Sequence, residues 1–155
     1  MEKGCFVITI LKDNRNPKET RYNYSLCFSI GLHNRDAAIL QEIQTYFNGV
    51  GRITALDKEA DHYRVTSLKE LALIIAHFDK YPLITQKLAD YLLFKQAFEL
   101  ISRKEHLAKD GYLKLIAIKS SINKGLSPDL KAIFPNVTPI QRPLVVEKLS
   151  KTLIG

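Results

Sequence analysis

The amino-acid sequence predicts an α+β domain in which a four-stranded antiparallel sheet carries helices on one face. Two runs, 5–11 and 21–31, alternate apolar and polar residues with the period of two typical of half-buried strands. A second pair of strand-like runs follows at 52–56 and 62–66, again joined by a short polar loop, which antiparallel neighbours allow. Apolar residues at helical spacing fill the stretches after each pair. The predicted order is strand, strand, helix, strand, strand, helix, helix, then short C-terminal helices.

The first two strands show which residues share a face. Phe6, Ile8 and Ile10 have one parity in the first run. In the second run the bulky apolar residues have one parity and the small or polar residues have the other. The apolar set is Tyr22, Tyr24, Leu26, Phe28 and Ile30. This pattern predicts a sheet with one packed face and one face open to water.

Start and stop signals bound the helices. Asn34 or Asp36 can cap a helix that ends before the glycines of segment 48–51. Residues 67–70 (Ser-Leu-Lys-Glu) form a capping box for the next helix. After Pro82, Thr85 is expected to cap a long helix to about Arg103. A shorter helix is expected over 112–123, and Ser127-Pro128 starts a last one that ends near 134.

Composition limits the class of protein. The chain has 155 residues, 46% hydrophobic and 25% charged, which predicts a globular chain of one domain, or one domain with a tail. No apolar run is long enough for a membrane span. Cys5 and Cys27 have no CxxC spacing, so neither a zinc site nor a disulfide framework is indicated. The net charge of +7 favours polyanions as partners.

The open face of the predicted sheet is a candidate nucleic-acid interface. Arginine can bridge guanine O6 and N7, short polar side chains adapt to several base edges, and a two-stranded ribbon fits the major groove. The alternative to a nucleic-acid interface is the solvated face that any antiparallel sheet can have. The outward apolar residues Val7, Leu11 and Leu56 either contact thymine methyl groups or are covered by another element. The candidate DNA-binding residues are Thr9, Arg21, Asn23, Ser25, Ser29, Arg52, Thr54, His62, Arg64 and Thr66.

No catalytic constellation is evident, because the four histidines are scattered and no glycine-rich phosphate loop is present. One segment is unusual. Pro82 stiffens a turn that delivers Thr85, Gln86 and Lys87 to a helix N-terminus, where backbone N–H groups and a lysine can meet a phosphate. The alternative is an ordinary helix start with a surface lysine.

Several segments together resemble a known family. Gly-Cys-Phe at 4–6, FSIGLHNRD at 28–36 and FDKYPLITQK at 78–87 are similar to the LAGLIDADG homing endonucleases, the intron-encoded group common in fungal mitochondria. Further similarity covers 93–98, 104–107 and 118–126. The resemblance therefore spans nearly the whole chain, in order.

The resemblance implies a homing-endonuclease half-domain over residues 1–134, whose sheet is a saddle for DNA, followed by an extended connector over 135–155. It implies metal-dependent phosphodiester hydrolysis with Mg²⁺, catalytic roles for Lys87 near the scissile phosphate and for Gln86 in orienting water, and a mitochondrial location. Partners would be double-stranded DNA, intron RNA and a second half-domain, with no membrane.

One departure bears on cleavage. The family's signature helix precedes the first strand, and its last turn carries a metal-binding acid directly before the glycine that matches Gly4. Here Lys3 has that position, so no metal ligand is assigned, and Glu2 is only a weak candidate. The chain is therefore expected to be the first half of a two-half protein without its signature helix, or a degenerate remnant.

Three functions follow. The first is site-specific recognition of double-stranded DNA by a homing-endonuclease half-domain, with cleavage uncertain because of Lys3. The second is an RNA-binding intron maturase that uses the lysines of the later helices: Lys104, Lys109, Lys114, Lys119 and Lys124. The third is a catalytically dead relic.

Overall fold

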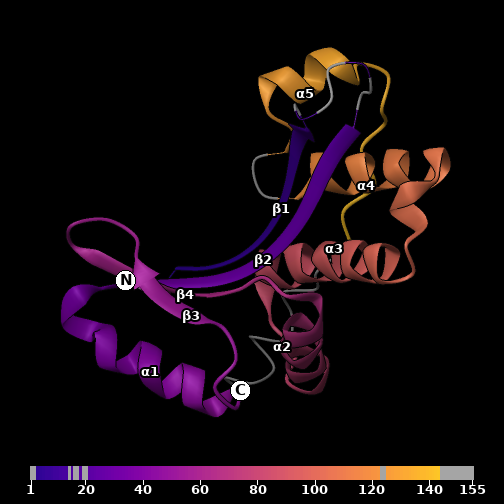
Figure 1. Ribbon diagram of the computed structural model, residues 1–155. Coiled ribbons are helices and arrows are strands. Elements are labelled where there is room, and N and C mark those ends of the chain that lie inside the picture. Colours follow the sequence, from indigo (N-terminus) through magenta and orange to yellow (C-terminus); the bar gives the residue numbers. More distant parts are fainter. Residues whose placement is uncertain (1–2, 14, 16–17, 19–20, 123–124, 144–155) are drawn as a thin grey trace. The chain divides into compact units, whose positions relative to one another are not determined.

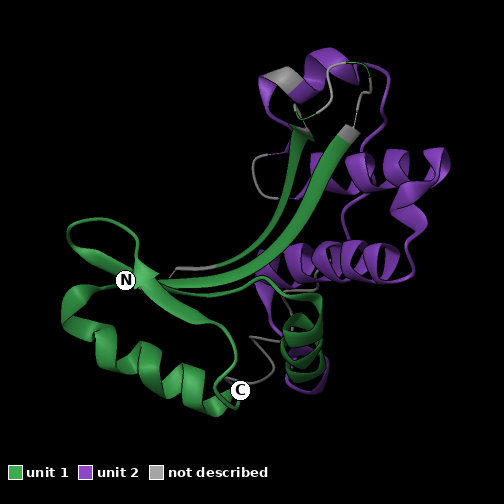
Figure 2. Ribbon diagram, viewed as in Figure 1, with its two compact units in different colours: residues 1–77 green, residues 78–155 purple. Residues whose placement is uncertain are grey.

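A computed structural model describes residues 3–13, 15, 18, 21–122 and 125–143 of the chain. It divides into two compact units, residues 1–77 and 78–155 (Figure 2). The first contains all the strands and the second most of the helices. Helix α2, Leu68–Lys80, runs across the boundary. No helix in the described part of the chain is long and apolar enough to cross a membrane.

The four strands form one antiparallel sheet with the order β1-β2-β4-β3 (Figure 1). Strands β1 (Lys3–Asp13) and β2 (Arg21–His33) make a long hairpin, and β3 (Arg52–Ala55) and β4 (Ala60–Val65) make a short one. Strand β4 joins the hairpins, because residues Phe28–His33 of β2 pair with residues Ala60–Val65 of β4. The predicted strand pairs are therefore neighbours in a single sheet.

One face of the sheet is apolar, as the alternation predicted. Phe6 and Phe28 lie directly opposite each other and their rings are 5.2 Å apart. Helix α1 (Ala37–Tyr46) packs on this face of the first unit, where Phe47 at its C-cap stacks on the ring of Tyr63. Burial of such side chains is the main favourable term in folding. The buried side chains of the sheet on this face are Phe6, Ile8, Ile10, Leu26, Phe28, Ile30, Leu32, Tyr63 and Val65.

The predicted capping box at α2 does not form as expected. The Glu70 carboxylate accepts a 2.6 Å hydrogen bond from the backbone N–H of Gly51, in the turn before β3. Gly51 has φ of +83°, and a side chain there would meet the Tyr63 ring at 2.6 Å, so the turn requires glycine. The capping box does not form because the Glu70 carboxylate binds the backbone N–H of Gly51, a tertiary partner that the local sequence pattern does not reveal.

The second unit is a group of helices, namely α3 (Thr85–Ser102), η2 (Glu105–Leu107), α4 (Lys109–Ser121) and α5 (Pro128–Ile133). Buried residues of α3 lie around more than one face, as expected for a helix enclosed on several sides. They are Ala89, Tyr91, Leu93, Phe94, Ala97, Leu100 and Ile101. The predicted Ser127 cap of α5 is confirmed, because its Oγ accepts from the Leu130 N–H at 3.3 Å and Pro128 follows.

Candidate nucleic-acid interface

The candidate DNA-binding residues lie on one face of the sheet, and this face is called the polar face below. The strand register shows it directly, since residues opposite each other in a pair point to the same side. Thr9 lies opposite Ser25, Ser29 opposite Arg64, and Thr54 opposite His62. The polar face comprises Thr9, Asn23, Ser25, Ser29, Arg52, Thr54, His62 and Arg64, with Thr66 directly after β4. Arg21 pairs at the far end of β2, and its side chain lies outside the described part.

The polar face is accessible to a ligand in the first unit. Six of its side chains are exposed, namely Asn23, Ser25, Arg52, Thr54, Arg64 and Thr66. Thr9, Ser29 and His62 are half-buried. Leu11 and Leu56, which the sequence left open, are 62% and 54% exposed, so no described element of the first unit covers them. Hydrogen-bonding groups, arginines and single apolar groups therefore face outwards together.

Two arginines lie directly opposite each other on this face. Arg52 of β3 pairs with Arg64 of β4, and like charges at opposed positions destabilise a sheet. Within the described residues, no carboxylate forms an ion pair with either guanidinium. Burial and the neighbouring Arg64 charge lower the pKa of His62, which keeps its ring neutral near pH 7. Arg52 and Arg64 thus have no ion-pair partner among the described residues, and an anion bound between them would offset their repulsion.

The predicted catalytic residues Gln86 and Lys87 lie in the first turn of α3, in the second unit. Thr85 does not cap this helix as expected. The N-cap is Ile84, without a side-chain bond, and Thr85 has φ of +64°, a left-handed conformation that is costly for a β-branched residue. Lys87 is exposed. A strained start to a helix is a feature that surrounding contacts must hold in place.

Contacts on both sides of this turn hold it. Before it, the Tyr91 hydroxyl donates to Asp79 Oδ1 at 2.8 Å, and Lys95 Nζ pairs with the same carboxylate at 2.8 Å. The hydrogen bonds from Lys95 and then from Tyr91 hold the pKa of Asp79 below its usual value. Asp79 precedes the proline turn and its two partners lie on α3. The ion pair between Asp79 and Lys95 therefore connects the residues before this turn to α3.

Arg142 holds the first turn of α3 from the residues that follow α5. Its Nη1 donates to Asp90 Oδ1 at 2.9 Å and to the Ser121 carbonyl oxygen at 2.7 Å, and its Nη2 donates to Gln86 Oε1 at 3.2 Å. The backbone N–H of Ile140 donates to the Ala117 carbonyl oxygen. Residues 135–143 contain no helix or strand, yet they are bonded to α3 and α4. The Gln86 side chain is thus oriented by a residue 56 positions later in the chain.

Comparison with known proteins identifies the family. The family model described as LAGLIDADG endonuclease matches residues 3–98. The chain belongs to the LAGLIDADG endonuclease family. The Neurospora crassa protein named "Probable intron-encoded endonuclease 3" is 37% identical over 144 residues, 92% of this chain and 27% of that protein. A Podospora anserina protein described as an uncharacterized 50.9 kDa protein in ND4 intron 1 is 42% identical over 109 residues, 69% of this chain and 24% of that protein.

Solved LAGLIDADG meganucleases share the fold, which confirms the predicted class. The structure of I-SmaMI bound to cleaved DNA has a TM-score of 0.87 and 38% identity, covering 92% of this chain and 47% of that one. The structure of I-CpaMI bound to uncleaved DNA has a TM-score of 0.85 and 44% identity, covering 94% of this chain and 49% of that one. The chain therefore spans about half of these meganucleases and about a quarter of the two curated relatives.

The described residues of this LAGLIDADG chain do not fit a divalent-metal centre. No group of three or more histidine, cysteine or acidic side chains lies together within 3–13, 21–122 and 125–143 in a way that could hold a metal. The weak candidate Glu2 lies outside the described residues, and so does the side chain of Lys3. A lysine ammonium group has no lone pair to offer a cation.

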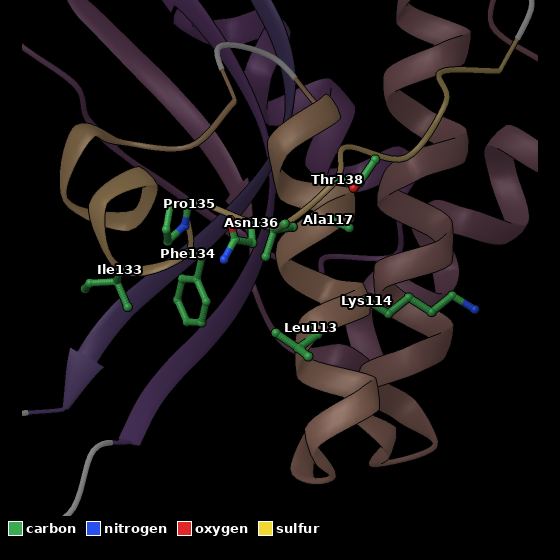
Figure 3. Close-up of a pocket in the computed structure, with 9 residues that line it drawn as sticks. Leu113, Lys114, Ala117, Ile133, Phe134, Pro135, Asn136 and Thr138 are labelled. Carbon is green, nitrogen blue, oxygen red and sulfur yellow. The ribbon is translucent and has the colours of Figure 1, made fainter.

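Two cavities lie among the described residues of this LAGLIDADG chain. One of about 430 Å³ lies at an end of the polar face, where Ser29, Gly31 and His62 line it together with Leu56 of the β3–β4 turn. The other, of about 470 Å³, lies in the second unit between α4 and the segment after α5 (Figure 3). Leu113, Ala117 and Phe134 make its wall mainly apolar. Sequence reasoning missed both, because each depends on how a turn folds back.

Proposed function

We propose that the polar face recognises a specific sequence of double-stranded DNA in the major groove. One observation carries the proposal: polar side chains continue in register across all four strands, with Arg52 opposite Arg64 and no ion-pair partner for either among the described residues. Phosphates would offset the repulsion of the two arginines, and base edges offer O6 and N7 acceptors to their N–H groups. The relatives I-SmaMI and I-CpaMI, whose structures are bound to DNA, support it.

The proposed reading residues are those expected from the sequence. They lie on the four strands or, for Thr66, directly after β4, and the major groove is wide enough for a two-stranded ribbon. The short hairpin β3–β4 and the long hairpin β1–β2 would supply one ribbon each. The residues are Thr9, Arg21, Asn23, Ser25, Ser29, Arg52, Thr54, His62, Arg64 and Thr66.

We further propose that residues 1–134 form one half-domain and that residues 135–155 lead towards a second one. The length of the relatives supports this, because the chain covers about half of each solved meganuclease. Two such halves would double the length of DNA contacted. A mitochondrial location is proposed from the Podospora anserina relative, which is described by an ND4 intron.

For the reaction, we propose that the chain is part of a Mg²⁺-dependent phosphodiester hydrolase in which Lys87 stabilises negative charge at the scissile phosphate and Gln86 orients water. Preorganised positive groups of this kind stabilise a transition state more than a ground state. The bond from Arg142 to Gln86 and the exposure of Lys87 support these roles. In this proposal a carboxylate for Mg²⁺ comes from outside the described residues, where Glu2 is the weak candidate that the sequence offers.

The proposal predicts that duplex DNA displaces structured RNA from this chain. The A-form major groove of RNA is too deep and narrow for a ribbon, so the polar face can make only phosphate contacts with it. The test is an equilibrium competition at one salt concentration, with labelled duplex DNA against an intron-derived RNA hairpin of equal phosphate count. DNA is expected to win by about tenfold or more.

Two double variants that remove the same charge show whether the polar face causes the preference for DNA. Changing Arg52 and Arg64 to glutamine should abolish the advantage of DNA, whereas changing the exposed Lys109 and Lys114 to glutamine removes the same charge and should preserve it. If RNA displaces DNA, and only the lysine variant loses RNA binding, the chain is an RNA-binding maturase. If neither nucleic acid binds above the level of an unrelated basic protein, it is a relic.

A further inference from the structure

Cys27 departs from the pattern of the polar face to which it belongs. Its parity in β2 matches Ser25 and Ser29, yet only 7% of its surface is exposed, whereas Ser25 is exposed. The Nε–H of Arg64 donates a hydrogen bond to the Cys27 sulfur at a distance of 3.4 Å. Ser29 lies directly opposite Arg64, so Cys27 is its diagonal neighbour across the two strands.

This contact fixes which donors of Arg64 remain for a ligand. A guanidinium has five N–H donors in a rigid plane, and a guanine can be bridged either by Nε with one Nη or by the two Nη groups end-on. The Nε–H is directed to sulfur, so only the end-on fork of Nη1 and Nη2 is available. No described residue accepts from either Nη atom of Arg64.

We propose that Cys27 is a positioning residue, which holds the Arg64 guanidinium so that its Nη1–Nη2 fork meets guanine O6 and N7 end-on. This inference rests on the proposed function of the polar face. Arg52 adds a second constraint, because it repels Arg64 from the β3 side while Cys27 accepts from it on the β2 side. The two neighbours lie on opposite sides of β4.

A thiol suits this role because it orients the Arg64 guanidinium without competing with DNA for its Nη groups. A carboxylate at position 27 would pair with the fork and neutralise it, whereas a thiol is a weak acceptor and a small apolar body. The interaction directs Nε and leaves the charge of Arg64 for the DNA. A hydroxyl is the closest functional replacement, since it too accepts a single hydrogen bond.

The test is selection of a randomised duplex library by the whole 155-residue chain and its variants, in a reducing buffer. Cys27→Ala is expected to lower the preference for guanine about fivefold or more at one base position, the position whose preference Arg64→Ala removes. Other positions and the affinity for random duplex should not change. Cys27→Ser should restore the preference. Cys5→Ala, a half-buried cysteine on the same face, is the matched control and should change nothing.

A second measurement follows the contact without DNA. In nitrogen-15 spectra of the free chain, the Arg64 Nε–H is expected to exchange with water several-fold faster in Cys27→Ala than in the wild type, and to remain slow in Cys27→Ser. A site enriched equally by the wild type and Cys27→Ala overturns this inference while the proposed function stands. A wild type that enriches no site overturns the proposed function and, with it, the role of the fork.

Discussion

Arg64→Ala is expected to reduce the preference for a single base pair by about 1–3 kcal/mol, or roughly 5- to 150-fold. Arg64 lies on β4, one of the two central strands, faces outwards, and keeps both Nη groups available. A bidentate contact to one guanine specifies that base and no other. The measurement is library selection followed by comparison of base frequencies at each position of the bound site.

Arg103→Ala is the matched control, because it removes the same charge from an exposed side chain at the C-cap of α3. It should weaken binding to all sequences slightly and leave base frequencies unchanged. If Arg64→Ala also weakens all sequences equally and lowers the salt slope by about one, Arg64 contacts a phosphate and does not read a base.

Gly111→Ala is expected to destabilise the chain by about 3 kcal/mol or more, above the usual cost of overpacking. A methyl group at this position would collide with the backbone carbonyl group of Glu105 in η2, which cannot move like the end of a side chain. Relief would require η2 and the first turn of α4 to separate. Chemical denaturation measures the change as a lower midpoint.

Gly49→Ala is the control for this substitution. Gly49 has φ of +81° but nothing lies within contact of an added methyl group, so only backbone strain applies, at about 1–2 kcal/mol. An equal loss of stability in the two variants would contradict the collision at Glu105. A much larger loss for Gly111→Ala would confirm that close packing of η2 on α4 requires glycine.

Much of the fold follows from local patterns. The alternation of Phe6, Ile8 and Ile10 predicts a buried face, and the observed register places Ser29 and Arg64 of two neighbouring strands on the opposite face. Parity carries this information because a strand repeats every two residues. The family resemblance is likewise confirmed, since its motifs are local runs of sequence.

Other features depend on partners distant in sequence and could not be predicted. Glu70 bonds to Gly51 in place of the capping box, and α4 begins at Lys109, before its expected start, because Gly111 lets its first turn pack on η2. Arg142 donates a hydrogen bond to Asp90, which lies 52 positions earlier in the chain. The sequence pattern gives Cys27 the same outward parity as its neighbours, and only the position of the Arg64 side chain shows the hydrogen bond to its sulfur. In each case a tertiary contact decides what local propensity leaves open.

Recognition of duplex DNA by the polar face is tested most directly by binding the chain to a randomised duplex library across a series of salt concentrations. Sequencing of the retained fraction then shows which positions are specified. We expect one enriched site with several specified base pairs, at least one of them a guanine whose preference is lost in Arg64→Ala, and an affinity that falls steeply with salt. Salt-dependent retention with no enriched sequence would contradict it.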